Sequence, residues 1–128
     1  MNTRQDPDRH LPLPPHMFQI LLSLLDRERH GYAIIKDVET RTAGEMVLGT
    51  STVYAAIKRM HRDGLVQQAE APPGEDSDGP KRRYYGITGF GRRVARLEGL
   101  RIARLNRMVA ETSLLAAGEG ALSEEQGQ

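Results

Sequence analysis

Residues 50–62 combine hydroxyl, aromatic and cationic side chains at a spacing that fits one face of a helix. If this segment is helical, Val53, Ile57 and Met60 lie at i, i+4 and i+7 and predict its buried face. The side chains on or beside the opposite face are Thr50, Ser51, Thr52, Tyr54, Ala55, Lys58 and Arg62. Hydroxyl groups and a helix N-terminus bind phosphates, and cations bind phosphates or guanine edges. We therefore expect this face to contact a nucleic acid in the major groove.

A second group of cations, Lys81, Arg82 and Arg83, begins a predicted β-strand and is followed by two tyrosines. Three consecutive cations repel one another unless an anion lies nearby, and a DNA backbone would supply that anion. Alternate side chains of a strand share a face, so we expect one of Tyr84 and Tyr85 in the core and the other exposed. The acidic hairpin tip before this strand is expected to turn away from phosphate. These features predict a wing along the DNA backbone.

Charge is segregated along the chain, although the formal net charge is only +1. Residues 58–107 contain twelve Lys or Arg and six Asp or Glu, whereas residues 108–128 contain four Glu and no Lys or Arg. A basic segment between neutral and acidic ends favours a polyanion partner that meets one face of the molecule. The alternative is an arginine-rich surface that is simply solvated.

The composition disfavours several classes of protein. The chain has no cysteine, so neither disulfides nor thiolate metal sites can stabilise the fold. The four histidines show no metal-ligand spacing, and no metalloprotease or nucleophile motif occurs, so we expect no metal, no cofactor and no catalysis. No apolar run is long enough for a membrane span, and the N-terminus does not resemble a secretory signal. We therefore expect a cytoplasmic protein with no membrane partner.

The spacing of apolar residues, prolines and glycines predicts four helices, at about residues 15–27, 32–42, 50–63 and 89–117. It also predicts strands at residues 46–48, 65–71 and 81–88. We expect Thr50 or Ser51 to be the N-cap of the third helix and Gly64 to end it. Before the second helix, we expect Gly31 to adopt a backbone conformation that other residues cannot. The fold class is therefore mostly α with a small antiparallel β-wing, which is a winged helix-turn-helix domain plus a long C-terminal dimerisation helix.

The last helix carries an apolar stripe that is longer than a three-helix core can cover, and the first helix is apolar on most sides. An exposed apolar stripe of this length is unstable alone, so we expect a homodimer. The residues expected at its interface are Phe18, Leu22, Leu25, Leu97, Leu100, Leu105, Met108 and Leu115. In order, we expect a disordered N-terminal arm (1–13), a winged helix-turn-helix DNA-binding domain (14–88), a dimerisation helix (89–117) and a flexible tail (118–128).

Four motifs follow one another along the chain. They are His30–Gly31–Tyr32, Gly49–Thr50–Ser51–Thr52–Val53–Tyr54–Ala55–Ala56–Ile57, Gly64–Leu65–Val66 and Lys81–Arg82–Arg83–Tyr84–Tyr85–Gly86–Ile87–Thr88. With these motifs, from about Leu21 to the end of the last helix, the chain resembles the PadR family of bacterial regulators. The resemblance implies a winged-helix DNA-binding domain with a C-terminal dimerisation helix, acting usually as a repressor. It also allows a small-molecule effector, which nothing else in the sequence supports.

We therefore predict a sequence-specific regulator that binds double-stranded promoter or operator DNA as a homodimer. Its two recognition helices would lie about 34 Å apart, one DNA turn, on a pseudo-palindromic site. An alternative with the same fold is a protein–protein interaction module that has no DNA role. Cations on both the third helix and the wing favour DNA. For Tyr54, the alternative is that its ring packs on the second helix.

Overall fold

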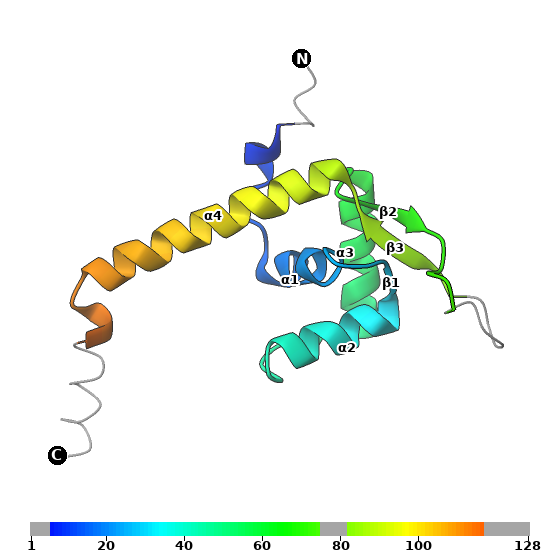
Figure 1. Ribbon diagram of the computed structural model, residues 1–128, viewed down its shortest axis with the longest axis horizontal. Helices are drawn as coiled ribbons and strands as arrows, with labels where there is room; N and C mark the ends of the chain where they lie inside the picture. Colours follow the sequence, from blue (N-terminus) through cyan, green and yellow to red (C-terminus); the bar gives the residue numbers. More distant parts are fainter. Residues whose placement is uncertain (1–5, 75–81, 117–128) are drawn as a thin grey trace. The chain divides into compact units, whose positions relative to one another are not determined.

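The computed structural model of the protein describes residues 6–74 and 82–116. Its elements are η2 (Pro7–His10), α1 (Pro15–Ser23), β1 (Arg29–His30), α2 (Gly31–Arg41), α3 (Thr50–Arg62), β2 (Val66–Ala69), β3 (Tyr84–Ile87) and α4 (Gly89–Glu111) (Figure 1). The chain forms two compact units, Met1–Glu98 and Gly99–Gln128, and the boundary between them falls within α4. The first unit is a mostly helical domain with a small antiparallel sheet, as the sequence predicts.

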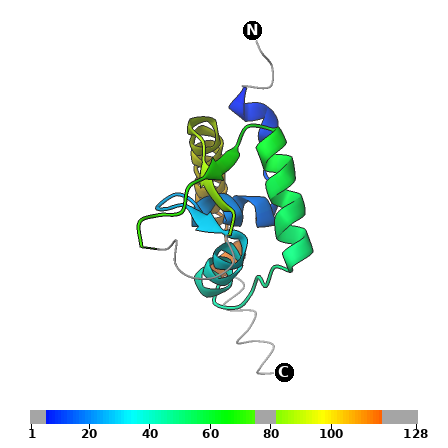
Figure 2. The same ribbon diagram turned by 90° about the vertical axis from the view of Figure 1, so that its right-hand side faces the viewer.

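The core of the first unit lies between α1, α2 and α3. Fully buried aliphatic side chains from these helices meet there, among them Ile20, Leu21, Ile34, Val38, Val53 and Met60. The predicted inner face of α3 is confirmed, since Val53 and Met60 are 0% exposed and Ile57 is 4% exposed. The opposite side of α3 faces away from the rest of the first unit (Figure 2). This packing leaves one whole helical face available to a partner.

The sheet has the strand order β1-β3-β2, and both pairings are antiparallel. Tyr84 and Tyr85 of β3 pair with His30 and Arg29 of β1 on one side, while Gln67 pairs with Gly86 on the other. The prediction of a strand at residues 46–48 was wrong, because that segment is irregular and Leu48 is buried in the core. The third strand is β1 instead. Its two residues are too few to show an alternating pattern.

The ends of α3 differ from one another. Gly49 is the N-cap, so neither Thr50 nor Ser51 caps the helix as we expected, and both lie in the first turn. At the other end Gly64 has φ +80, its N–H donates to the His61 carbonyl at 3.1 Å, and the Leu65 N–H donates to the Met60 carbonyl at 2.8 Å. These two bonds make a Schellman motif and confirm Gly64 as the residue that ends the helix.

Thr88 joins the wing to the helices on either side of it. Its hydroxyl donates to the Gly64 carbonyl at 2.6 Å and accepts the Gly91 N–H at 2.9 Å. The second bond caps the start of α4, and the first bond ties the end of β3 to the turn after α3. The wing is therefore held in position relative to α3.

The predicted disordered arm needs a correction for residues 7–13. Pro7–His10 form a 3-10 helix, Leu13 is buried at 7% exposed, and its N–H donates to Glu98 Oε2 at 3.2 Å. The ring of His10 also meets that of Phe90 edge-on, with centroids 5.4 Å apart. Polar composition predicted disorder here, but Leu11 and Leu13 are apolar enough to dock on the core. Residues 1–5 lie outside the described residues.

The second unit begins at Gly99, within α4. The helix ends at Glu111 rather than at residue 117, and Leu114–Ala116 form a separate helical turn. The Thr112 hydroxyl accepts the Leu114 N–H at 3.0 Å and so starts that turn. The expected flexible tail, residues 118–128, lies outside the described residues.

Candidate nucleic-acid interface

The outward face of α3 carries the side chains that the helical period predicts. Thr50, Ser51, Thr52, Tyr54, Ala55, Lys58 and Arg62 are all exposed. Arg62 lies 3.7 Å from Asp63, but its side chain is 73% exposed, so this ion pair leaves it accessible. Arg59 is also exposed on α3, and the sequence reasoning missed it. Its position four residues after Ala55 was the signal that could have found it.

The base of the wing adds further cations. Arg82 and Arg83 are exposed just before β3, whereas Lys81 lies outside the described residues. The expectation that one tyrosine of β3 would be exposed was wrong, because Tyr84 and Tyr85 are each only 6% exposed. Successive side chains of β3 project from opposite faces, and both faces are covered: Tyr84 meets the His30 ring, and Tyr85 joins the core.

The Tyr85 side chain contacts Arg83, one of the exposed cations at the base of the wing. Burial raises the pKa of Tyr85 above its usual value of 10.0, and the nearby Tyr54 adds to the rise. Arg83, which hydrogen-bonds to the Tyr85 side chain, acts in the opposite direction on this pKa. Tyr85 is therefore a neutral hydrogen-bonding group at physiological pH, and it links Arg83 to the core.

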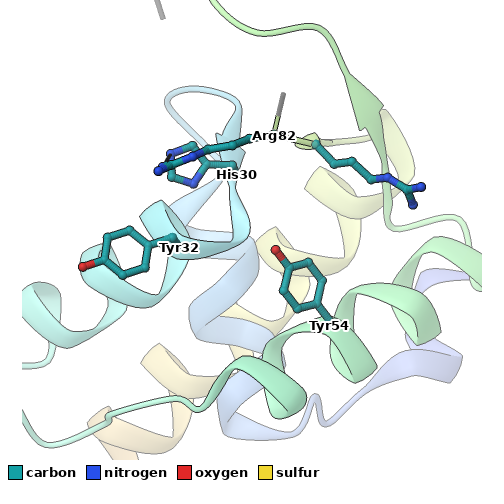
Figure 3. Close-up of a pocket in the computed structure, with 5 residues that line it drawn as sticks. His30, Tyr32, Tyr54 and Arg82 are labelled. Atoms are coloured by element: carbon teal, nitrogen blue, oxygen red, sulfur yellow. Dashed lines mark hydrogen bonds between the residues drawn. The ribbon is translucent and has the colours of Figure 1, made fainter. Parts of the chain in front are cut away.

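An open cavity of about 450 Å³ lies between α2, α3 and the base of the wing (Figure 3). Its lining residues are His30, Tyr32, Tyr54, Arg82 and Arg83. In Figure 3, Arg82 lies across His30 while Tyr54 rises from α3 toward them. The described residues that line the cavity include no Asp or Glu, so its charged groups are cations. The sequence indicates His30 and Tyr32 only as part of a motif, because their neighbours in the cavity come from distant segments.

His30 is held by contacts with three elements. Its Nδ1 accepts the Ala33 N–H at 3.1 Å and so caps α2, while its Nε2 lies 3.0 Å from Arg82 Nη1. The ring also stacks on Tyr32 with centroids 6.5 Å apart and meets Tyr84 edge-on at 5.3 Å. The cap and the two ring contacts fix where Nε2 points, and they keep it beside the wing.

Gly31 explains the position of Tyr54. Gly31 does not have a positive φ, so the expectation that it is needed for its backbone conformation was wrong. It is needed for space, because a Cβ at Gly31 would lie 2.6 Å from the Tyr54 Oη. Tyr54 therefore packs on the first residue of α2 and still keeps 45% of its surface exposed. The alternative, that the ring packs on the second helix, is therefore confirmed, and a contact of Tyr54 with DNA stays a prediction.

The sequence of the chain is similar to those of known proteins. Residues 20–97 match the family described as the transcriptional regulator PadR-like family. The chain belongs to the PadR-like family of transcriptional regulators. An uncharacterised protein of Lysinibacillus sphaericus is 36% identical over 78 residues, which are 60% of this chain and 69% of that protein.

Solved structures of PadR-like proteins resemble the chain in fold. A PadR family transcription regulator from Clostridium difficile aligns with a TM-score of 0.64 at 24% identity, over 77% of this chain and 97% of that one. A PadR-like transcriptional regulator from Bacillus cereus aligns with a TM-score of 0.62 at 21% identity, over 74% and 87% of the two chains. At these identities the likeness concerns the fold alone, and it agrees with the winged-helix fold class.

The residues expected at a dimer interface are of two kinds in the structure. Phe18, Leu22 and Leu97 are partly buried within the first unit, and Leu25 is 37% exposed. In the second unit, Leu100, Leu105, Met108 and Leu115 are 47%, 49%, 55% and 57% exposed. Leu100, Leu105 and Met108 lie on α4, whereas Leu115 lies in the turn after it, and apolar side chains that stay half exposed on one helix form a surface suited to a partner.

Residues 6–74 and 82–116 contain neither a cluster of metal-ligating side chains nor a helix that could span a membrane. In these ranges, no cluster of three or more His, Cys, Asp or Glu side chains is placed to hold a metal ion. None of the helices within the same ranges is long and apolar enough to cross a membrane.

Proposed function

We propose that the PadR-like chain is a repressor that binds duplex DNA sequence-specifically as a homodimer. In each copy, α3 enters the major groove with Thr50, Ser51, Thr52, Lys58 and Arg62 at its surface. Arg82 and Arg83 bind the neighbouring backbone, and Lys81 is proposed to join them. Occupation of a promoter would then block the polymerase.

The observation that carries this proposal is the division of α3 into two faces. The inner face is buried at 0–4% exposure at Val53, Ile57 and Met60, so the helix cannot roll without losing its core contacts. The outer face is exposed and bears hydroxyl groups and cations. A rigid helix of this kind presents base-reading side chains in a fixed orientation, which direct readout requires.

The half-exposed apolar residues of the second unit support the homodimer. Leu100, Leu105 and Met108 lie on one helix with 47%, 49% and 55% exposure. Burying them against a second copy would remove them from water, and the resulting dimer would contain two α3 helices. A twofold protein favours a pseudo-palindromic site with half-sites about 34 Å apart.

Fluorescence anisotropy tests the proposal. Duplexes selected by the protein from a random pool would be compared with scrambled duplexes at two salt concentrations. We expect tight, salt-sensitive binding with a preference for the selected duplex of about 10³ or more. Equal, weak binding to both duplexes would contradict sequence-specific regulation and would favour a protein-interaction module.

A further inference from the structure

The cavity between α2, α3 and the wing gathers hydrogen-bond donors from segments far apart in the sequence. Arg82 and Arg83 come from the wing, Tyr54 from α3, and His30 from the start of α2. The N-terminal end of an 11-residue helix, α2, borders the same space and adds partial positive charge. With no Asp or Glu among its described lining residues, the cavity favours an anion.

The tautomer of His30 strengthens this conclusion. A neutral imidazole has one N–H and one lone pair. Because Nδ1 accepts the Ala33 N–H at 3.1 Å, the hydrogen is assigned to Nε2. Arg82 Nη1, only 3.0 Å from Nε2, is also a donor, since a guanidinium has no acceptor. His30 and Arg82 therefore both present N–H donors at the cavity that they line.

The packing of Tyr54 shows the direction in which its hydroxyl points. The Oη would be 2.6 Å from a Cβ at Gly31, so it is directed toward α2 rather than straight outward with Lys58. Tyr54 as a whole is still 45% exposed, and it lines the cavity. Figure 3 shows this hydroxyl turned toward the space beside His30 and Arg82.

We propose that this cavity, here named the phosphate seat, binds one phosphate group of the DNA backbone. Its ligands are His30 Nε2–H, the Arg82 guanidinium and the Tyr54 hydroxyl. The proposal rests on the proposed function and assigns His30 and Tyr54 to the backbone rather than to base edges. A backbone phosphate is favoured over a free anion because the cavity is open and lies between α3 and the wing, the two elements proposed to meet DNA. Binding here would fix the register of α3 in the groove.

Two conservative variants test the seat without removing its scaffold. His30→Asn keeps a side-chain oxygen that can accept the Ala33 N–H, because asparagine is a good N-cap, but it removes the Nε2 donor. Tyr54→Phe keeps the ring on Gly31 and removes only the hydroxyl. Arg96→Ala is the matched control, since Arg96 is an exposed cation of α4 that does not line this cavity. Thermal unfolding of each variant checks that the domain is intact.

Affinity would be measured by anisotropy on a duplex that the wild-type protein has selected. We expect His30→Asn and Tyr54→Phe each to weaken binding about three- to tenfold, as the loss of one hydrogen bond to a charged group would. Arg96→Ala is expected to change affinity less than twofold.

A scan of the same duplex with single neutral methylphosphonates then identifies the phosphate. At one position in each half-site, the substitution should weaken binding of the wild-type protein. On that duplex, His30→Asn should lower the affinity no further. This loss of additivity is what direct contact predicts and what a merely structural role of His30 would not produce.

Three results would overturn the proposal that this cavity binds a backbone phosphate. If the wild-type protein selects no duplex, the proposed function fails and the seat fails with it. If the wild-type protein binds its duplex but His30→Asn and Tyr54→Phe bind equally well, the seat fails alone. If inorganic phosphate at low millimolar concentration shifts the His30 ring signals in NMR spectra while the methylphosphonate scan shows no coupled position, the cavity holds a free anion instead.

Discussion

Two helices of the chain, α3 and the part of α4 that follows Glu98, carry apolar residues at helical spacing but bury them to very different extents. In α3, Val53 and Met60 are 0% exposed, and the polar residues occupy the outer face. In α4, Leu105 and Met108 are 49% and 55% exposed. The apolar face of α3 is satisfied within one copy of the chain, whereas that of α4 is not. The difference indicates that α3 offers its polar face to a partner and α4 its apolar face.

The largest expected effect comes from Met60→Ala on the inner face of α3. Met60 is fully buried, and its truncation leaves a cavity, so the free energy of unfolding should fall by about 2–4 kcal/mol. Urea denaturation followed by circular dichroism, at a concentration where the chain is monomeric, measures this change. The control is Leu105→Ala, which should alter the same free energy by less than about 0.5 kcal/mol. Equal losses in both variants would remove the contrast between the two helices.

Leu105→Glu should act on assembly rather than on folding. A carboxylate at the centre of an apolar interface would lose its hydration without a partner, so the dimer should dissociate. Light scattering after size-exclusion chromatography should give the mass of one chain instead of two, while the circular dichroism spectrum stays unchanged. An unaltered dimer mass would show that this helix face is not the interface.

The third prediction separates the two surfaces proposed to contact DNA. Lys58→Ala should weaken binding by about 1–3 kcal/mol and relax base preference, because Lys58 lies on the outer face of α3. Arg82→Ala should weaken binding to all sequences alike and lower the salt slope by about 1. Anisotropy titrations over a salt series, with selected and scrambled duplexes, measure both quantities. Equal, sequence-independent losses in the two variants would contradict this division.

The smallest expected effect concerns Tyr85 beneath the wing. Burial raises the pKa of its hydroxyl above 10.0, so the folded state keeps this proton to higher pH than the unfolded state does. The resulting stabilisation is complete below pH 10 and is lost as the pH rises through the raised pKa. Titration by ultraviolet absorbance should show a late tyrosinate step that Tyr85→Phe and strong denaturant both remove. Persistence of that step in Tyr85→Phe would assign it to another tyrosine.

Much of the fold could be predicted because the decisive signals are local. The period of Val53, Ile57 and Met60 fixes which side of α3 is buried, and Gly64 ends the helix because only its φ of +80 allows the turn. The outer face of α3 followed from the same period. These features depend on residues within a few positions of one another.

The parts that could not be predicted depend on contacts between distant segments. Arg82 lies beside His30, 52 positions earlier, and Leu13 bonds to Glu98, 85 positions later. Tyr84 of β3 is buried against the His30 ring of β1, and a two-residue strand such as β1 leaves no pattern in the sequence. The cavity around His30 is therefore visible only in the folded chain.

Hydroxyl-radical footprinting of the wild-type protein on a selected duplex tests the central claim most directly. If α3 of two copies reads the major groove, two protected blocks should appear, related by twofold symmetry and centred about 34 Å apart. Both blocks should disappear together in Leu105→Glu. A single block that survives in Leu105→Glu, or protection with no fixed position, would contradict the account.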